Sequence, residues 1–415
     1  MSSNQQTVII GGGIIGLACA YFLQAQGNSV RVIHDVGIDE STSCGNAGGV
    51  ATAEIIPLSG PGALLCAPKW LVDPLGPLSI RASYLPRLLP WFWRFIRSGT
   101  PSKRLYLAQA MADLLKTAQQ DHDAVLHATG LSHLLHKKGT LFVYKSLRGM
   151  RADQSAWDMR QACGVVYESL DRSGVLQFEP GLGPLAKCGR RVEDWAHYRD
   201  PAELVAGLAE YLKTNGVIFE RGRVETVVVA DNKATGVVLS DGKRINADKL
   251  IVAAGAWSSD LAAQLGSRVS LESERGYNTT LPTPGVDIRS FVTFSEDFFV
   301  MTPMRMGLRI GGAVEFAGLT APANYMRSKA LVKLAKTYLP DLNADGGTEW
   351  MGHRPSTPDS VPVIGPCAKF DNVFFAFGHG HLGLTGSMTT GRLISELVAG
   401  KTPSTDLSPF RIDRF

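Results

Sequence analysis

The sequence predicts an α/β fold in which one domain is inserted into another, and the first observation lies at the N-terminus. An apolar strand over residues 7–10 runs through a glycine-rich turn into a helix over residues 14–26. Gly27 and Asn28 end that helix, and a second apolar strand follows at residues 29–33. A strand, glycine turn, helix and strand in so short a segment are typical of a Rossmann-type domain with parallel strands.

Two further observations predict how the rest of the chain is organised. Glycine turns follow apolar strands again near residues 254 and 378, so distant segments are expected to build one domain. Residues 270–315 alternate apolar and polar side chains with frequent Pro and Gly, which predicts an antiparallel sheet in an inserted α+β domain. The predicted segments of the Rossmann-type domain are 1–80, 195–265 and 345–415, and those of the inserted domain are 81–194 and 266–344.

The remaining elements follow from periodicity and from helix start and stop signals. The predicted helices cover residues 79–97, 102–128, 148–163, 202–214, 324–338 and 384–399. The predicted strands cover residues 139–144, 217–220, 224–229, 235–239, 249–253 and 373–377. Between Pro355 and residue 373 the chain is expected to form a loop.

The composition excludes several classes of protein. The 415 residues contain 42 Lys and Arg against 38 Asp and Glu, and a net charge of +4 does not suggest a nucleic-acid-binding stripe. A hydrophobic content of 45% with 19% charged residues excludes general disorder. The 44 glycines amount to about 11% of the chain against a usual ~7%, so many backbone positions are expected to turn tightly or approach a ligand.

The sequence also bears on compartment. Neither a signal-peptide pattern nor a stretch of ~18 apolar residues is present, so we expect a cytoplasmic protein. The cysteines are scattered without a Cys-x-x-Cys pair, which favours reduced thiols over disulfides or a zinc site. They are Cys19, Cys44, Cys66, Cys163, Cys188 and Cys367.

Residues 85–97 leave two interpretations open. Their aromatic side chains, including Trp91 and Trp93, stand among Arg87, Arg94 and Arg97. Aromatic residues interleaved with cations suit the headgroup region of a membrane, which allows peripheral contact with the inner face of the cell membrane. The alternative is an ordinary helix that packs its aromatic face on the core.

The first glycine turn carries the dinucleotide fingerprint Gly11-x-Gly13-x-x-Gly16. In this pattern the first glycine allows a tight turn, the second lets the backbone approach a pyrophosphate, and the third lets the helix pack on the strand. The backbone N–H groups that open the helix then face the phosphates. The acid expected after the second strand is displaced: His34 occupies the usual position and Asp35 follows it, so either could contact the ribose.

Beyond this fingerprint, several motifs are similar to one family over nearly the whole chain. They are Thr42-Ser43-x-x-Asn46-Ala47-Gly48, residues 67–70, Ala253-Ala254-Gly255-Ala256-Trp257-Ser258, Gly276-Tyr277, residues 309–312, Gly352-His353-Arg354-Pro355 with its continuation to Gly365, and residues 378–384. The chain resembles the FAD-dependent D-amino acid oxidase superfamily, which includes glycine and sarcosine oxidases. Within it, the sequence is most similar to bacterial D-amino acid dehydrogenases.

The resemblance implies FAD as cofactor, held by a Rossmann-type FAD-binding domain with an inserted α+β substrate domain built on an antiparallel sheet. It implies hydride transfer from the α-carbon of a D-amino acid to the flavin, giving an imino acid that hydrolyses to a 2-oxo acid; no metal is expected. The implied cofactor-binding residues are Gly11, Gly13, Ile14, Ile15, Gly16, His34, Asp35, Thr42, Ser43, Asn46, Ala47, Gly48, Val224, Ala254, Gly255, Trp257, Gly378, Gly380, His381, Leu382, Gly383 and Leu384.

The substrate carboxylate needs a planar, bidentate cation, which points to an arginine. Arg275, Arg305, Arg309 and Arg354 are the candidates, and Arg305 and Arg354 are favoured. Tyr277 is expected to hydrogen-bond the carboxylate, and His379, or else His381, to touch the substrate or the flavin.

The electron acceptor and the substrate stay open at this point. A dehydrogenase would pass electrons to a quinone or another respiratory acceptor, whereas an oxidase would use oxygen, with Lys69 as one residue that could serve it. A flavin-binding partner subunit or a tRNA-modifying enzyme is a further alternative, although the low net charge disfavours the second. The substrate is expected to be a D-amino acid or a cyclic D-imino acid such as D-proline or cis-4-hydroxy-D-proline.

Overall fold

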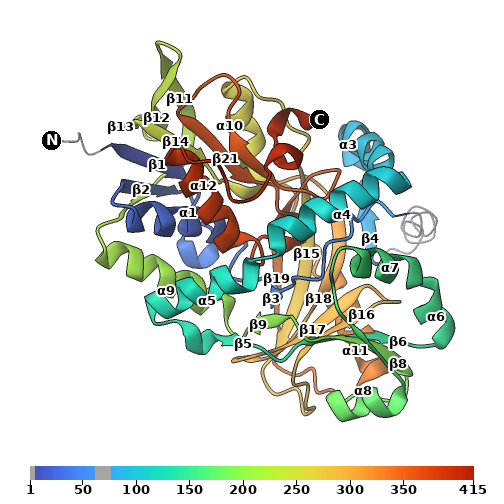
Figure 1. Ribbon diagram of the computed structural model, residues 1–415. Helices are drawn as coiled ribbons and strands as arrows, with labels where there is room; N and C mark the ends of the chain where they lie inside the picture. Colours follow the sequence, from blue (N-terminus) through green and yellow to red (C-terminus); the bar gives the residue numbers. More distant parts are fainter. Residues whose placement is uncertain (1–4, 61–75) are drawn as a thin grey trace.

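The computed structural model of the chain describes residues 5–60 and 76–415, and its first layer is a six-stranded sheet (Figure 1). Five strands are parallel, and the edge strand β20 is antiparallel to its neighbour. In order across the sheet they are β10 (Ile218–Arg221), β2 (Ser29–His34), β1 (Gln6–Ile10), β14 (Lys249–Val252), β21 (Val373–Phe377) and β20 (Val363–Pro366). The first and last parts of the chain therefore lie side by side, as predicted from the recurring glycine turns.

Helices cover this sheet because their apolar faces are buried against it. Helix α1 (Ile14–Ala25) follows β1 directly and packs against α12 (Ser387–Val398) and α9 (Pro201–Thr214). A Cβ on Gly391 of α12 would lie 2.6 Å from the backbone carbon of Ala18 in α1, so the two helices touch through their backbones. Helix α9 begins at Pro201 because the Asp200 side chain accepts hydrogen bonds from the backbone N–H groups that follow it.

The second layer is a nine-stranded sheet. Its main path runs β19 (Thr348–Ser356), β15 (Glu272–Leu281), β18 (Gly307–Phe316), β17 (Phe299–Met304), β16 (Phe291–Phe294), β6 (Thr140–Tyr144), β8 (Cys188–Val192) and β7 (Glu168–Leu170), and β4 (Leu78–Ile80) pairs with β18. Pairing among β15 to β18 is antiparallel, which confirms the prediction for residues 270–315. Helix α11 (Met326–Tyr338) packs on β15 and β18.

Two smaller sheets and further helices complete the fold. One three-stranded sheet contains β11 (Val224–Ala230), β12 (Lys233–Leu239) and β13 (Arg244–Asn246), and another contains β3 (Gly49–Val50), β9 (Ala196–Tyr198) and β5 (Leu135–His136). The other helices are α3 (Leu85–Ser98), α4 (Pro101–Leu115), α5 (Ala118–Thr129), α6 (Leu147–Ala152), α7 (Gln154–Ala162), α8 (Arg172–Phe178) and α10 (Ser258–Gln264).

Several predicted elements differ from the structure. The helix predicted over 79–97 begins only at Leu85, because residues 78–80 form a strand that pairs with β18. The helices predicted over 102–128 and 148–163 are each divided in two, and the final helix begins at Ser387 rather than at 384. Strands β19 and β20 were not predicted, and β20 lies where a loop was expected.

The division into domains stays a prediction. Strands β4 and β19 fall within segments that were assigned to the cofactor domain, yet both hydrogen-bond in the nine-stranded sheet. Close to the predicted boundaries at 80 and 345, two short segments that were assigned to the cofactor domain therefore belong to the nine-stranded sheet.

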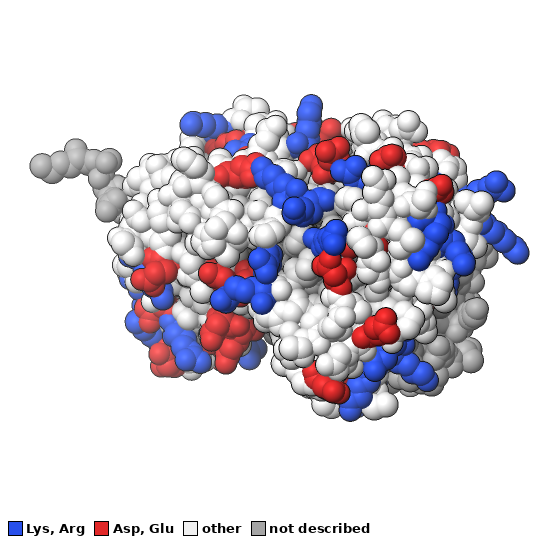
Figure 2. All heavy atoms as spheres, turned by 90° about the horizontal axis from the view of Figure 1, so that it is seen from below, with Lys and Arg blue, Asp and Glu red and all other residues white. Residues whose placement is uncertain are grey.

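The surface carries charges of both signs. Figure 2 shows Lys and Arg interspersed with Asp and Glu on the face that it presents, in keeping with a net charge of +4. The five cysteines among the described residues are free, and Cys66 lies outside that part of the chain. Within residues 5–60 and 76–415, no helix has the length and apolar character needed to cross a membrane.

Helix α3 divides its aromatic residues between core and solvent. Leu88 and Trp91 are buried, and the Trp91 indole N–H donates to the carbonyl of Ser356 at 3.1 Å. Trp93 and Leu89 on the other side are 61% and 56% exposed. One face of α3 thus packs on the core and the other presents apolar side chains to the surroundings, while contact with a membrane stays a prediction.

Candidate active site

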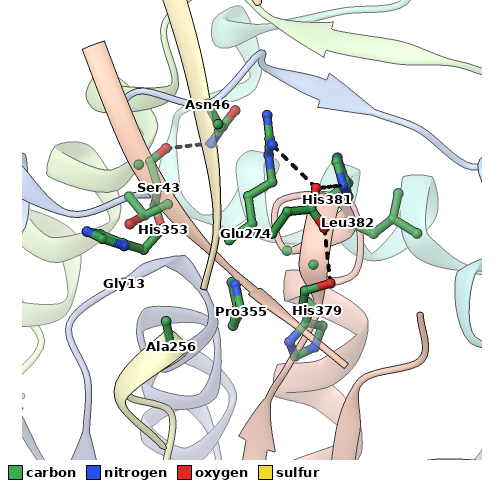
Figure 3. Close-up of a pocket in the computed structure, with 18 of the residues that line it drawn as sticks. Gly13, Ser43, Asn46, Ala256, Glu274, His353, Pro355, His379, His381 and Leu382 are labelled. Atoms are coloured by element: carbon green, nitrogen blue, oxygen red, sulfur yellow. Dashed lines mark hydrogen bonds and ion pairs between the residues drawn. The ribbon is translucent and has the colours of Figure 1, made fainter. Parts of the chain in front are cut away.

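A cavity of about 1200 Å³ opens between the two layers (Figure 3). One wall contains the glycine turn after β1, the end of β2, residues 253–257 and residues 376–384. The opposite wall contains residues of β15, β18 and β19. Pockets for small ligands usually measure about 300–1,000 Å³, so this cavity has room for a dinucleotide together with a small substrate.

Two positions of the glycine turn accept only glycine. Gly11 has a φ of +126°, and a Cβ there would lie 2.2 Å from the carbonyl oxygen of Ala253. A Cβ on Gly16 would lie 1.9 Å from the carbonyl oxygen of Gly11. Both obstacles are backbone atoms that cannot move cheaply, so strand β1, helix α1 and the end of β14 require these two glycines.

The end of β2 places His34 and Asp35 on the cavity wall. The His34 Nδ1 lies 2.9 Å from the carbonyl oxygen of Val36, and because a carbonyl only accepts, Nδ1 carries the proton. This contact leaves the Nε2 of His34 as an acceptor, and the ribose contact of His34 or Asp35 stays a prediction.

The loop over residues 42–48 is held by hydrogen bonds within it and from the nine-stranded sheet. Ser43 Oγ accepts from the backbone N–H of Ile14 at 3.0 Å, which joins the loop to the first turn of α1. Asn46 accepts from the Gly48 N–H at 2.6 Å through its side chain, and from Arg309 Nη1 at 2.6 Å through its carbonyl. Arg309 therefore supports this loop and is not one of the cavity-lining residues.

A buried carboxylate, which the sequence did not single out, lies at the opposite wall. Glu274 of β15 is 2% exposed, and its Oε1 lies 2.5 Å from His381 Nε2 and 3.5 Å from Arg354 Nη1. Ser356 donates to its Oε2 at 3.1 Å. Burial by itself would raise the pKa of Glu274, but His381, Arg354 and Ser356 together lower it to about 2, so the carboxylate is ionised at neutral pH.

Arg354 is the arginine that reaches this cavity wall. Its guanidinium lies across Gly276, where a Cβ would be only 2.1 Å from Nη2, and its Nη1 donates to the carbonyl of Ala313 at 3.1 Å. Burial lowers the pKa of Arg354, and Glu274 opposes this shift.

The structure does not place Arg305 at this site. Its side chain is 67% exposed, pairs with Asp200 at 2.8 Å and Glu203 at 3.3 Å, and is not among the residues that line the cavity. The reason is its position: β17 ends at Met304 and β18 begins at Gly307, so Arg305 stands in the turn between them.

Tyr277 borders the cavity, but its hydroxyl points elsewhere. The hydroxyl donates to Glu315 at 2.5 Å and accepts from the Asn324 N–H at 3.0 Å. Along β15, Glu274 and Gly276 share one face because side chains alternate with a period of two, and Tyr277, the residue after Gly276, lies on the other face. The hydroxyl is thus already engaged by Glu315 and Asn324, and its contact with a substrate carboxylate stays a prediction.

The two histidines of the last glycine turn differ in their surroundings. His379 is buried, its Nε2 lies 2.9 Å from Thr390 Oγ1, and burial lowers its pKa to about 3. Its Nδ1 has no hydrogen-bonding partner among the described residues. The side chain of His381 is 39% exposed and points toward Glu274 (Figure 3).

His122 of α5 contacts the backbone at the end of this turn. It was not identified from the sequence, because it is one polar residue within a long predicted helix. It is fully buried, and its Nε2 lies 3.1 Å from the carbonyl oxygens of both Leu384 and Thr385. Its Nδ1 lies 2.7 Å from the Tyr198 hydroxyl. The turn itself continues through a short 3-10 segment at Gly380–Leu382 before α12 begins.

The predicted cofactor-binding residues thus come together. All of them line the cavity except Gly16, which lies beneath Gly11, and Gly378, which has a φ of +81° and turns the chain away from β21.

Comparison with known proteins then decides the family. The profile of the family described as FAD dependent oxidoreductase matches residues 6–397. The chain belongs to this FAD-dependent oxidoreductase family. A D-amino-acid oxidase of Bradyrhizobium diazoefficiens is 36% identical to this oxidoreductase, with 100% of both chains covered. A D-amino acid dehydrogenase of Xanthobacter autotrophicus is 31% identical, with 98% of each chain covered.

The fold of the oxidoreductase agrees with a solved structure. The glycine oxidase of Bacillus cereus superimposes with a TM-score of 0.74 over 99% of both chains at 19% identity, which supports the predicted α/β fold. The cavity also fits the FAD of this family. It is large enough for a dinucleotide, and glycines of the first and last turns line it. The buried His379 Nδ1 has no hydrogen-bonding partner within the described chain, and a bound group could supply one.

Proposed function

We propose that the enzyme oxidises the α-carbon of a D-amino acid, with Arg354 as the residue that binds the substrate carboxylate. The observation that carries the proposal is the guanidinium of Arg354, which lies on Gly276 in the same cavity as the glycine turns. A planar guanidinium binds a carboxylate through two parallel hydrogen bonds and so fixes the orientation of the α-carbon. Relatives with full-length coverage are named D-amino-acid oxidase and D-amino acid dehydrogenase, which supports a D-amino acid as substrate.

In this proposal most of the predicted residues hold the cofactor, and the rest of the cavity binds the substrate. The glycine turn of residues 11–16, the loop at 42–48, Val224, the segment at 254–257 and the turn at 378–384 hold FAD. FAD, when bound, supplies the hydride acceptor. The chain itself binds the carboxylate, excludes water with the apolar side chains that line the cavity, and releases an imino acid that hydrolyses to a 2-oxo acid.

The test is anaerobic bleaching of the bound flavin by a panel of amino acids. The panel contains D-amino acids, L-amino acids, sarcosine, D-proline and cis-4-hydroxy-D-proline. Bleaching by D-amino acids and loss of this response in Arg354→Gln support the proposal, whereas bleaching by L-amino acids alone overturns it. If the cyclic compounds bleach the flavin fastest, the substrate is a cyclic D-imino acid.

The acceptor is proposed to be a quinone or another respiratory carrier, reached at a membrane surface. Supporting this, Leu89 and Trp93 of α3 are exposed beside the exposed Arg87, Arg94 and Arg97, and such a mixture suits anionic lipid headgroups. Trp93→Ser is expected to weaken binding to vesicles that contain anionic lipid. Val166→Ser, which changes an 83% exposed apolar residue elsewhere, serves as the control and should not. Hydrogen peroxide formed in equal amount with the 2-oxo acid would instead identify an oxidase.

A further inference from the structure

Glu274 and His381 form a carboxylate–imidazole pair at the wall of the cavity that the proposed function does not yet use. The two atoms in contact, Oε1 and Nε2, lie 2.5 Å apart, and Figure 3 shows the side chains pointing toward one another. The carboxylate comes from the nine-stranded sheet and the imidazole from the last glycine turn. The pair therefore connects the two walls of the cavity.

The ionised state of Glu274 determines which nitrogen of His381 carries the proton. Arg354 and Ser356 stabilise the charge of the carboxylate, and an ionised carboxylate can only accept hydrogen bonds. The contact with Nε2 is an ion-pair contact at 2.5 Å, and the charge of the carboxylate favours a proton on the nitrogen that faces it, so the neutral imidazole has its lone pair on Nδ1. A carboxylate in this position also stabilises the imidazolium that forms when Nδ1 takes up a proton.

The Nδ1 of His381 is available to a substrate. Within residues 5–60 and 76–415 it has no hydrogen-bonding partner, and the side chain is 39% exposed on the cavity wall. Arg354 and His381 contact the same oxygen of Glu274, so one small molecule can reach both side chains. An α-amino acid has its carboxylate and its nitrogen on one carbon, and is therefore of a suitable size.

Amino acids are ammonium ions at neutral pH, and the nitrogen must lose a proton before its lone pair can form a C=N bond. We propose that His381, oriented by Glu274, accepts this proton from the substrate bound at Arg354. One N–H bond of the ammonium breaks, its electron pair stays on nitrogen, and the proton moves to Nδ1. FAD, when bound as in the proposed function, would supply the acceptor for the α-hydrogen and its two electrons, and the nitrogen lone pair would complete the C=N bond.

The other charged and titratable groups at this part of the wall do not compete for the role near neutral pH. Arg354 of β19 is a cation, and Glu274 of β15 is ionised. Burial lowers the pKa of His379 to about 3, and burial together with Arg275 lowers that of His353 to about 4, so both are neutral at pH 7. His381 differs from both in its 39% exposed side chain on the cavity wall, and the role of proton acceptor is therefore assigned to it on this geometry.

The test uses the flavin-loaded enzyme and the variant His381→Gln, because glutamine retains a donor toward Glu274 but cannot accept the proton. We expect kcat/KM for a D-amino acid at pH 7 to fall about 10²–10⁴-fold, the range typical of a lost acid–base group. The deficit should shrink as the pH approaches the pKa of the substrate amine, because the substrate then arrives deprotonated. His133→Gln removes an exposed histidine that pairs with Glu203 at 3.8 Å outside this cavity, and should keep the pH profile of the unmodified enzyme.

Two further measurements separate this inference from failure of the proposed function. Binding of a carboxylate that lacks an amine, followed through the flavin spectrum, should change less than about twofold in His381→Gln, because Arg354 is intact. Glu274→Gln should lower kcat/KM with the same pH dependence. A loss that is equal at all pH values, or weaker binding of the amine-free carboxylate, would overturn the role of His381, whereas the absence of bleaching by any D-amino acid in the unmodified enzyme would overturn the proposed function itself.

Discussion

Gly276→Ala changes the position of Arg354 without changing any charge. The new Cβ would lie 2.1 Å from Arg354 Nη2 and 2.2 Å from Cζ, whereas ordinary contact begins near 3.4 Å. The guanidinium must therefore retreat by about 1.3 Å. A displacement of about 1 Å can reduce activity ~10²-fold. Loss of a hydrogen bond to a charged group corresponds to about 1.5–3 kcal/mol, or roughly 10–150-fold in affinity.

We expect KM for a D-amino acid to rise about 10–100-fold. Because the obstacle is a flexible side chain and alanine is tolerated in strands, FAD content and thermal stability should change little. Steady-state kinetics with an artificial dye as acceptor measure KM, and a double-mutant cycle with Arg354→Gln identifies the cause. If Gly276→Ala acts through Arg354, it has no further effect in the Arg354→Gln background. Unchanged KM, or effects of the two substitutions that add, would refute the reasoning.

Three other substitutions test the surroundings of the site. Gly11→Ala, whose Cβ would lie 2.2 Å from the Ala253 carbonyl oxygen, should yield enzyme that loses its flavin on gel filtration, and full flavin retention would contradict the assigned role of the turn. His122→Leu should lower the free energy of unfolding in urea by about 2–4 kcal/mol, because the buried Tyr198 hydroxyl loses its partner; a change below ~0.5 kcal/mol would not agree. The pKa of His197 is lowered to about 3, chiefly by burial, so the unfolded chain binds this proton first as the pH falls. Stability is then lost from about pH 6.5 downward at up to ~1.4 kcal/mol per pH unit, and His197→Phe should flatten this dependence; parallel curves for the two proteins would exclude this contribution.

Much of the cofactor wall could be predicted because the backbone turns tightly and packs closely there, and only glycine fits such positions. Gly11 and Gly16 each lie against backbone atoms that no Cβ can avoid, so the local sequence carries the requirement. The recurrence of such turns after apolar strands also indicated that the two ends of the chain meet. The structure has both features.

The substrate wall could not be predicted in the same way, because it depends on register and on partners distant in the sequence. Arg305 and Arg354 are the same type of residue, so their sequence gives no reason to prefer one. Arg305 lies in a turn and is exposed, whereas Arg354 lies in a strand and reaches the cavity. Tyr277 next to Gly276 lines the cavity, but its hydroxyl contacts Glu315 and Asn324, partners that are distant in the sequence and could not be foreseen. Glu274 gave no signal, since its partner His381 comes from another element and a lone glutamate in a strand is unremarkable by itself.

The position of β21 in the six-stranded sheet has a consequence for how the protein is made. This strand pairs with β14, which pairs with β1, so residues near 375 complete a sheet begun near residue 6. A ribosome adds about 5–20 residues per second, and β14 therefore stays an open edge for many seconds of synthesis. Open edges recruit other strands, so the unfinished chain is exposed to aggregation until about its last tenth, which contains β21, emerges. A chain cut before β21 would retain most of its residues and still lack the strand that joins β20 to the sheet, together with the part of the cavity wall that residues 376–384 form.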